Sequence, residues 1–394
     1  MFSKIKIFNG KVITPYTIME NASVLVSEGK IIGIEEGNPS FPGALEIDAK
    51  GQYISPGFID IHIHGGGGSD FMDGTPEAFL NIAETHAKYG TSSMFPTTLT
   101  AEQGDLLATL ESFEIAKSRN TKGASLLGMH LEGPYFAMNQ KGAQDPRFIR
   151  NPDQSEYENL IKNYKTISRW SAAPELPGAM EFGKFLVENN ILPAIAHTDA
   201  IYEEAEEAFR NGYTLATHFY SAMLGVTRRN AYRYAGVVEA AYLIDDMDVE
   251  IIADGAHLPA PLLKLIYKIK GPKNIALITD AMRAAAMPEG KSLLGGLKNG
   301  VEVIVEDGVA KMPDRSSFAG SVATFDRLVR TMLNLAEVPL LDIITMACLT
   351  PARIMKVQDR KGSLEIGKDA DIVIFDNAIN IQMTMVEGRI IYQL

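Results

Sequence analysis

The spacing of apolar residues divides the chain into two β-rich ends and a middle part of different character. In residues 1–55, short stretches of alternating apolar and polar residues are separated by turn signals such as Asn9-Gly10 and Glu28-Gly29. Residues 356–394 have a similar pattern, including an apolar, β-branched run at 371–375. We therefore expect one small β-sandwich domain assembled from both ends of the chain, residues 1–55 and 356–394.

In the middle part, strand-like runs alternate with segments whose apolar residues recur with the helical period. Eight runs can be counted, at residues 58–64, 91–98, 125–132, 168–174, 192–197, 214–218, 249–253 and 275–280. This α/β alternation predicts a (β/α)8 TIM-type barrel over residues 56–355. A doubly wound sheet is the alternative, but the glycine run at 65–68 lacks the spacing of a dinucleotide-binding loop. Residues 299–312 indicate an additional hairpin after the eighth strand.

Composition and charge narrow the class of protein. The 394 residues are 46% hydrophobic with a net charge of -12, which argues against nucleic acid or an anionic membrane as a partner. Cys348 is the single cysteine, so no intramolecular disulfide can form. The first residues lack the apolar stretch of a signal peptide, and no apolar run approaches the ~20 residues of a membrane span. We expect a cytoplasmic enzyme.

Histidines concentrate at the ends of the predicted strands. His62 and His64 end the first strand, and side chains two positions apart on a strand point the same way. Both imidazoles should therefore face the mouth of the barrel, although a pair of core histidines is the alternative reading. Four more of the seven histidines follow later strands, namely His130, His197, His218 and His257. His86 falls within a predicted helix and is expected to pack.

Two carboxylates follow the same rule, because Glu132 and Asp280 end the third and eighth strands. Buried carboxylates are costly unless they are paired or bind a cation. The whole set suits one or two divalent metal ions, with zinc or iron expected first and manganese or cobalt next. Its members are His62, His64, Glu132, His197, His218 and Asp280. A metal with an open position activates water, and Asp280 is our candidate for moving its proton to a leaving amine. Metal-assisted hydrolysis of an amide is the expected reaction class.

These motifs resemble the amidohydrolase superfamily, as do the opening ISPGFID at 54–60 and the closing GKDAD at 367–371. Within it, the chain is most similar to the N-acetylglucosamine-6-phosphate deacetylase family. The shared motifs are HLEGPY at 130–135, KGA at 141–143, AHT at 196–198, THFY at 217–220, IADGAH at 252–257, TDA at 279–281 and AGS at 319–321.

The resemblance carries roles for individual residues. It implies that Glu132, His197 and His218 hold the main metal, and that His62 and His64 complete a second site. Asp280 would be the general base and acid, and His257 would contact the substrate. The family also implies a homodimer in which an arginine of the neighbouring subunit reaches the substrate phosphate.

The departures from the family pattern fall on residues expected to bind the sugar. Gln144 stands where the family usually has histidine, and Ser221-Ala222 stands where it usually has Asn-Ala. The arginine region at 227–233 also differs from the family pattern. Arg229 is the expected phosphate ligand, and Arg228 and Arg233 are the alternatives. All three arginines could instead belong to a solvated loop that binds no ligand. The expected substrate is N-acetylglucosamine 6-phosphate. The galactosamine epimer, an unphosphorylated sugar, an N-acyl amino acid or a non-catalytic binding role are the alternatives.

Overall fold

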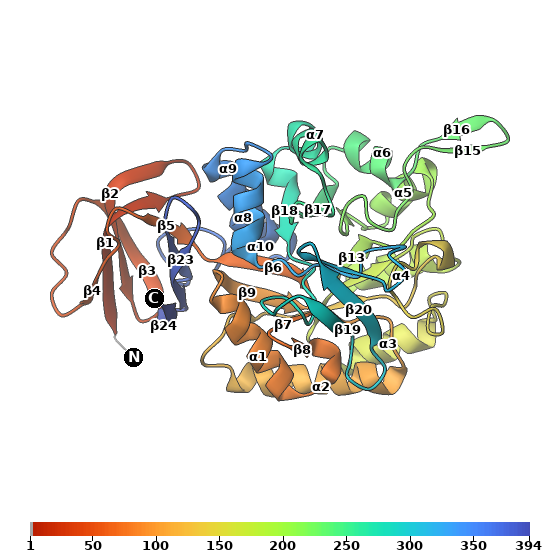
Figure 1. Ribbon diagram of the computed structural model, residues 1–394, viewed down its shortest axis with the longest axis horizontal. Helices are drawn as coiled ribbons and strands as arrows, with labels where there is room; N and C mark the ends of the chain where they lie inside the picture. The colour runs from red at the N-terminus through yellow and green to blue at the C-terminus, as the bar shows by residue number, and fades with distance from the viewer. Residues whose placement is uncertain (1–2) are drawn as a thin grey trace.

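The computed structural model describes residues 3–394 and contains a β sheet beside a barrel (Figure 1). Both ends of the chain build the sheet, whose strand order is β24-β23-β22-β5-β1-β2-β3, with β4 paired to β1. Its strands are β1 (Lys4–Ile13), β2 (Ile18–Ser27), β3 (Lys30–Glu36), β4 (Leu45–Asp48), β5 (Tyr53–Pro56), β22 (Ile372–Phe375), β23 (Ile381–Val386) and β24 (Arg389–Gln393). Buried side chains from both ends, such as Ile7 and Ile374, share one apolar cluster.

The central strands form the predicted barrel. They are β6 (Phe58–Ile63), β9 (Thr91–Pro96), β10 (Ser125–Leu126), β11 (Met129–Glu132), β12 (Ile167–Ala172), β13 (Leu192–Ile195), β14 (Leu215–Ala216), β17 (Asp248–Ile252) and β18 (Ile275–Ile278). Neighbours pair in parallel from β11 to β18 and from β6 to β10. The first and last strands meet where the Asp280 amide donates to the His62 carbonyl oxygen at 3.0 Å. The fold class expected from the sequence is confirmed.

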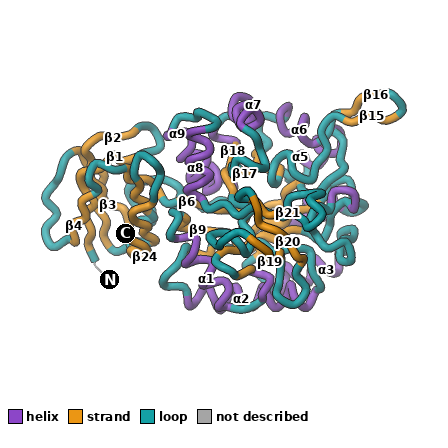
Figure 2. The backbone as a smooth tube through the Cα atoms, in the orientation of Figure 1, coloured by secondary structure: helices purple, strands orange, loops and turns teal. Residues whose placement is uncertain are grey.

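Helices cover the outside of the barrel (Figure 2). They include α1 (Pro76–Ala87), α2 (Gln103–Arg119), α3 (Gln154–Asn163), α4 (Ala179–Glu188), α5 (Tyr202–Arg210), α6 (Val237–Leu243), α7 (Ala260–Lys270) and α8 (Phe325–Asn334). Local sequence sets the start of α1: the Thr75 hydroxyl accepts from the Ala78 amide at 3.3 Å, and Pro76 suits the first position of the helix. None of the helices within residues 3–394 is long and apolar enough to cross a membrane.

Two local patterns differ from the sequence expectation. Strand β1 runs through Asn9-Gly10 with a register shift instead of turning there. A Cβ at Gly10 would lie 2.4 Å from the Ile54 side chain, so the glycine permits close packing within the sheet. The third predicted strand is divided into β10 and β11. Between them the chain at Gly128 passes so near Ser168 that a Cβ would lie 2.0 Å from its hydroxyl.

Two small sheets extend from the barrel. The predicted hairpin at 299–312 is part of a three-stranded sheet, β19 (Gly290–Leu294), β20 (Val301–Glu306) and β21 (Val309–Lys311). The second is a two-stranded hairpin, β15 (Thr227–Arg229) and β16 (Tyr232–Tyr234), which projects from the body of the molecule at the upper right of Figure 1. We call residues 227–234 the arginine hairpin.

Candidate metal centre

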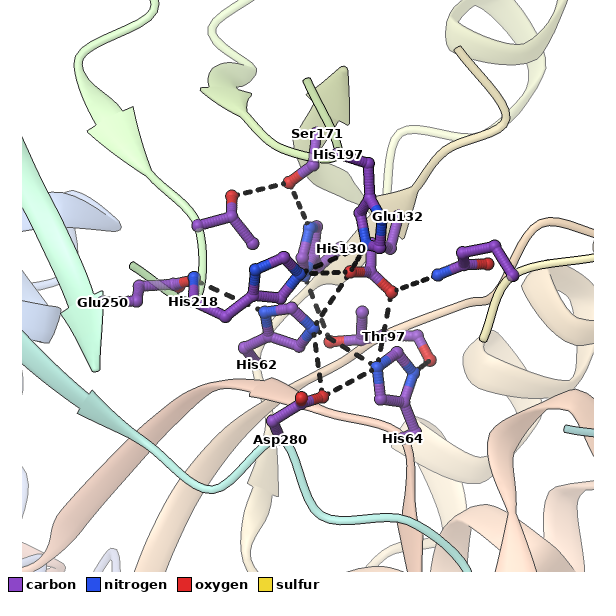
Figure 3. Close-up of polar contacts among 12 residues, drawn as sticks. His62, His64, Thr97, His130, Glu132, Ser171, His197, His218, Glu250 and Asp280 are labelled. Carbon is purple, nitrogen blue, oxygen red and sulfur yellow. Dashed lines mark hydrogen bonds and ion pairs between the residues drawn. The ribbon is translucent and has the colours of Figure 1, made fainter. Parts of the chain in front are cut away.

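Six polar side chains converge at one end of the barrel (Figure 3). All are buried and come from the ends of five strands: His62 and His64 at β6, Glu132 at β11, His197 after β13, His218 after β14 and Asp280 after β18. The carboxyl ends of the strands of a barrel surround a common mouth, which is where such folds hold their active sites. The structure thus brings together every residue that the sequence assigned to the metal.

Three of these residues leave their strands in the left-handed backbone conformation. The φ angles are 47° for His197, 31° for His218 and 47° for Asp280. A residue with a Cβ adopts this region at a cost of about 1 to 3 kcal/mol, and such strain gathers at functional sites. Backbone hydrogen bonds hold two of the bends, from Ser221 N to the His218 carbonyl and from Ser321 N to the Asp280 carbonyl, both at 2.8 Å.

Glu132 lies at the middle of the cluster and divides it into two groups. Its Oε1 atom lies 3.2 Å from His197 Nε2 and 3.1 Å from His218 Nε2, and its Oε2 atom lies 3.4 Å from His64 Nε2. His62 Nε2 lies 3.2 Å from His64 Nε2. Two groups of potential metal ligands result, and within each group the ligand atoms lie within 4.8 Å of one another. One group is Glu132, His197 and His218, and the other is Glu132, His62 and His64.

The hydrogen bonds on the far side of the imidazoles show that this donor set fits a cation. Three of the four Nδ1 atoms face acceptors: the Thr97 carbonyl for His64 at 3.3 Å, the Gln140 carbonyl for His197 at 2.7 Å, and the Glu250 carboxylate for His62 at 3.3 Å. Each acceptor requires a proton on Nδ1, which directs the Nε2 atom of the same ring toward the interior of the centre. The Nε2 atoms of His62 and His64, and those of His197 and His218, lie 3.2 Å apart, so each pair must share a proton or a cation. A divalent metal suits such a set of imidazole nitrogens.

The two carboxylates of the centre are held in their charged form. Burial opposes the ionisation of Glu132, but the surrounding imidazoles outweigh burial and lower its pKa well below the usual value. Burial likewise opposes the ionisation of Asp280, yet a hydrogen bond with His64 at 3.1 Å and the nearby imidazoles lower its pKa. Asp280 is therefore a carboxylate at neutral pH and can accept a proton.

A cleft of about 370 Å³ opens onto the centre. Most of the residues assigned from the sequence line it, namely His64, Glu132, Gln144, His197, His218, Ser221, Ala222, His257 and Asp280. His62 lies beneath them and is fully buried. Arg229 does not line the cleft; it is exposed on the arginine hairpin, where its guanidinium carbon lies 5.5 Å from the centre of the Tyr234 ring.

Gln144 and His257 are each held by a neighbouring polar group. The Gln144 amide nitrogen donates to Glu132 Oε2 at 2.8 Å, and its oxygen accepts from the Thr100 backbone amide at 2.8 Å. Gln144 thus orients a carboxylate of the centre as well as lining the cleft. His257 Nδ1 lies 2.9 Å from Asp254 Oδ2, which turns the other nitrogen of the ring away from that carboxylate.

Sequence reasoning missed the residues that support the centre from below. Arg169 on β12 and Glu250 on β17 are fully buried, and Glu250 contacts His62. The signal was present, because each is an ionisable residue inside an otherwise largely apolar strand, ISRWSA and DVEII. Charged residues are almost never fully buried without a partner, so such a strand indicates one.

Comparisons with known proteins agree with this centre. The profile of the Amidohydrolase family matches residues 53–391. An N-acetylgalactosamine-6-phosphate deacetylase from Escherichia coli O157:H7 is 33% identical, over 94% of this chain and 95% of its own. An N-acetylglucosamine-6-phosphate deacetylase from Lysinibacillus sphaericus is also 33% identical, over 94% and 93%.

A solved structure shows the same fold. It is a variant of the N-acetyl-D-glucosamine-6-phosphate deacetylase from Mycobacterium smegmatis in complex with N-acetyl-D-glucosamine-6-phosphate. The two chains are 26% identical and superimpose with a TM-score of 0.90 over 99% of this chain and 100% of that one. The matched profile, the full-length relatives and the His/Glu cluster lead to one conclusion: the chain belongs to the amidohydrolase family.

Proposed function

We propose that the protein hydrolyses the N-acetyl group of N-acetylglucosamine 6-phosphate, giving glucosamine 6-phosphate and acetate. The observation that carries the proposal is the buried cluster of four imidazoles and two carboxylates at the floor of the cleft. Full-length similarity to deacetylases of amino-sugar phosphates supports the choice of substrate.

In this proposal the cluster holds one or two divalent metal ions, zinc or iron first and manganese or cobalt next. Glu132, His197 and His218 hold one ion, and His62 and His64 add the ligands for a second beside Glu132. When bound there, a divalent ion polarises the amide carbonyl and lowers the pKa of a water molecule. The ring orientations fixed by Thr97, Gln140 and Glu250 keep the imidazole lone pairs on the inner side.

Asp280 moves the proton. Its carboxylate accepts a proton from the attacking water, whose oxygen forms a bond to the acetyl carbonyl carbon. Asp280 then donates that proton to the amine as the carbon–nitrogen bond breaks, so the products are acetate and the free amino sugar. The position of Asp280 at the floor of the cleft, with Oδ1 3.1 Å from His64 Nε2, supports this role.

The sugar would lie in the cleft above the centre, against Ser221, Ala222 and His257. For the phosphate we propose Arg229, or its neighbours Arg228 and Arg233, acting on the site of a second subunit in a homodimer. The arginine hairpin projects away from its own barrel, which suits such a role (Figure 1). Guanidinium groups bind phosphate oxygens in a bidentate manner.

The proposal also places the enzyme in the cytoplasm and divides it into a barrel, residues 56–355, and a β domain of residues 1–55 and 356–394. A chain with one buried cysteine suits a reducing compartment. The apolar cluster shared by both ends of the chain supports the division.

The galactosamine epimer is a second candidate substrate, because one full-length relative is named for it. Gln144 and Ser221 line the cleft, where they can affect the choice between epimers.

Acetate release from the two N-acetylhexosamine 6-phosphates and from unphosphorylated N-acetylglucosamine, with metal content measured on the same sample, tests the proposal. Fast turnover of the glucosamine compound and a large loss without phosphate are expected. A metal-replete protein that releases no acetate from either phosphate would overturn the proposal.

A further inference from the structure

A fully buried ion pair lies beneath the metal centre. Arg169 and Glu250 project into the barrel from β12 and β17, and both side chains have an exposed fraction of 0%. Arg169 Nη2 donates to Glu250 Oε2 at 2.9 Å, and Nη1 pairs with Glu250 Oε1. The same guanidinium donates to the Thr217 hydroxyl at 2.8 Å and to the Ile61 carbonyl at 3.2 Å. The pair therefore ties strands on opposite sides of the barrel.

The pair reaches the metal centre through one carboxylate oxygen. Glu250 Oε2 accepts from His62 Nδ1 at 3.3 Å and from the His218 backbone amide at 3.3 Å (Figure 3). One atom thus contacts both groups of the centre, the imidazole of His62 and the backbone that carries His218. No other side chain is hydrogen-bonded to His62 Nδ1 in the part of the chain that the structure describes.

A contribution to stability is a poor explanation of this pair. The cost of removing two charges from water roughly cancels their attraction, and apolar replacement of such pairs is often neutral or stabilising. A carboxylate behind a metal-ligating imidazole has a different use, because it fixes the tautomer and orientation of the ring. Arg169 contacts both oxygens of the Glu250 carboxylate, which holds the oxygen that faces His62 in place.

We propose that Arg169 and Glu250 are positioning residues for the His62/His64 part of the centre. Glu250 holds the proton on His62 Nδ1 and turns Nε2 toward Glu132 and His64, and Arg169 holds Glu250. The pair thereby raises metal affinity at the position that His62 completes. This inference rests on the metal-dependent hydrolysis proposed above.

The experiment is a titration of metal-stripped protein with Zn²⁺ and with Co²⁺, followed by chelator competition and by the visible spectrum of cobalt. His62→Ala identifies the metal equivalent that depends on His62. The test variants are the double Arg169→Met/Glu250→Leu, which removes both charges together, and Glu250→Gln, which keeps the size of the side chain. Asp248→Asn is the matched control, because it breaks the ion pair of Asp248 with Arg353 on the same strand but makes no contact with His62.

Both test variants should bind the His62-dependent equivalent about 10-fold to 100-fold more weakly, with an altered cobalt spectrum, and bind the other equivalent within about threefold of the original. The control should bind both equivalents unchanged. Wild-type affinity in a folded test variant would overturn the proposal, as would the absence of any His62-dependent equivalent in the original protein. Failure of both variants to fold would assign the pair to stability and overturn it too. These readouts need no substrate, so a protein that binds metal as expected but releases no acetate would refute the proposed function alone.

Discussion

The metal centre and the arginine hairpin are assigned to the same reaction, yet their surroundings are opposite. Each of the six residues of the centre is at most 8% exposed, and each is held by neighbours from several strands. On the hairpin Arg228, Arg229 and Arg233 are exposed, and Tyr232 is 74% exposed. The hairpin strands pair only with each other among residues 3–394. In the proposed function, one chain therefore supplies the groups for chemistry, whereas the contact to the phosphate would come from a second subunit.

The largest effect is expected within the centre. Asp280→Asn removes the group that carries the proton but keeps its size, so kcat should fall by on the order of 10²–10⁴-fold. Acetate release measures the change, and metal content on the same sample should stay near that of the original protein. Full activity in a metal-replete variant would remove Asp280 from the mechanism.

The hairpin should affect binding more than chemistry. Arg229→Ala is expected to raise KM for the phosphorylated sugar by roughly 10-fold to 100-fold, the loss of one charge-assisted hydrogen bond, with little change in kcat. The unphosphorylated sugar should be unaffected, which serves as the internal control. Lys298→Ala, a change on another loop of the barrel mouth, should alter neither parameter.

A mixture of two variants tests which subunit's site the arginine hairpin serves. If the hairpin serves the neighbouring site, a mixture of Asp280→Asn chains and Arg229→Ala chains contains hybrid dimers with one site that has both residues. Such a mixture should recover activity that neither variant shows alone at low substrate concentration. Activity equal to the average of the separate variants would show that the arginine acts within its own chain.

Gln144 lies at the border of the two regions, and its replacement should have an effect of similar size. Gln144→Leu removes the amide that donates to Glu132 Oε2 at 2.8 Å, a hydrogen bond to a charged group worth about 1.5 to 3 kcal/mol. We expect kcat/KM to fall by roughly 10-fold to 100-fold and metal affinity to weaken. An unchanged metal affinity with a raised KM would mean that Gln144 acts on the sugar alone.

A separate effect is expected on stability rather than on activity. His86 Nε2 donates to the Gly65 carbonyl at 2.9 Å, and burial lowers the pKa of this imidazole to about 4. The unfolded chain therefore binds a proton more readily than the folded protein between pH 6.5 and pH 4, so stability falls as the pH falls through this range. The loss approaches roughly 3 kcal/mol. Denaturant unfolding at several pH values should show a weaker pH dependence in His86→Gln, and equal slopes would contradict this account.

Periodicity and turn signals were sufficient for the barrel and for the joining of the chain ends. The alternating spacing of apolar residues in strands and their 3.6-residue spacing in helices are local sequence patterns, and the folded protein buries these residues accordingly. The break between β10 and β11 and the bulge at Asn9-Gly10 were not predicted. At each place the chain closely approaches a residue distant in the sequence, Ser168 and Ile54 respectively, and local patterns do not specify such contacts.

The amino-acid sequence was enough to identify the residues that could bind a metal, because the strand ends of a barrel meet at one mouth and the histidines and carboxylates at those ends can be seen in the sequence. The hydrogen bonds that orient these metal-binding side chains became known only from the tertiary structure. The contact of Glu250 with His62, the clamp of Arg169 on Glu250 and the bond of Gln144 to Glu132 join distant segments. A hydrogen bond forms only when the donor–acceptor distance is right to within a few tenths of an ångström and the angle is favourable. The spacing of residues along the sequence specifies neither the distance nor the angle between distant segments.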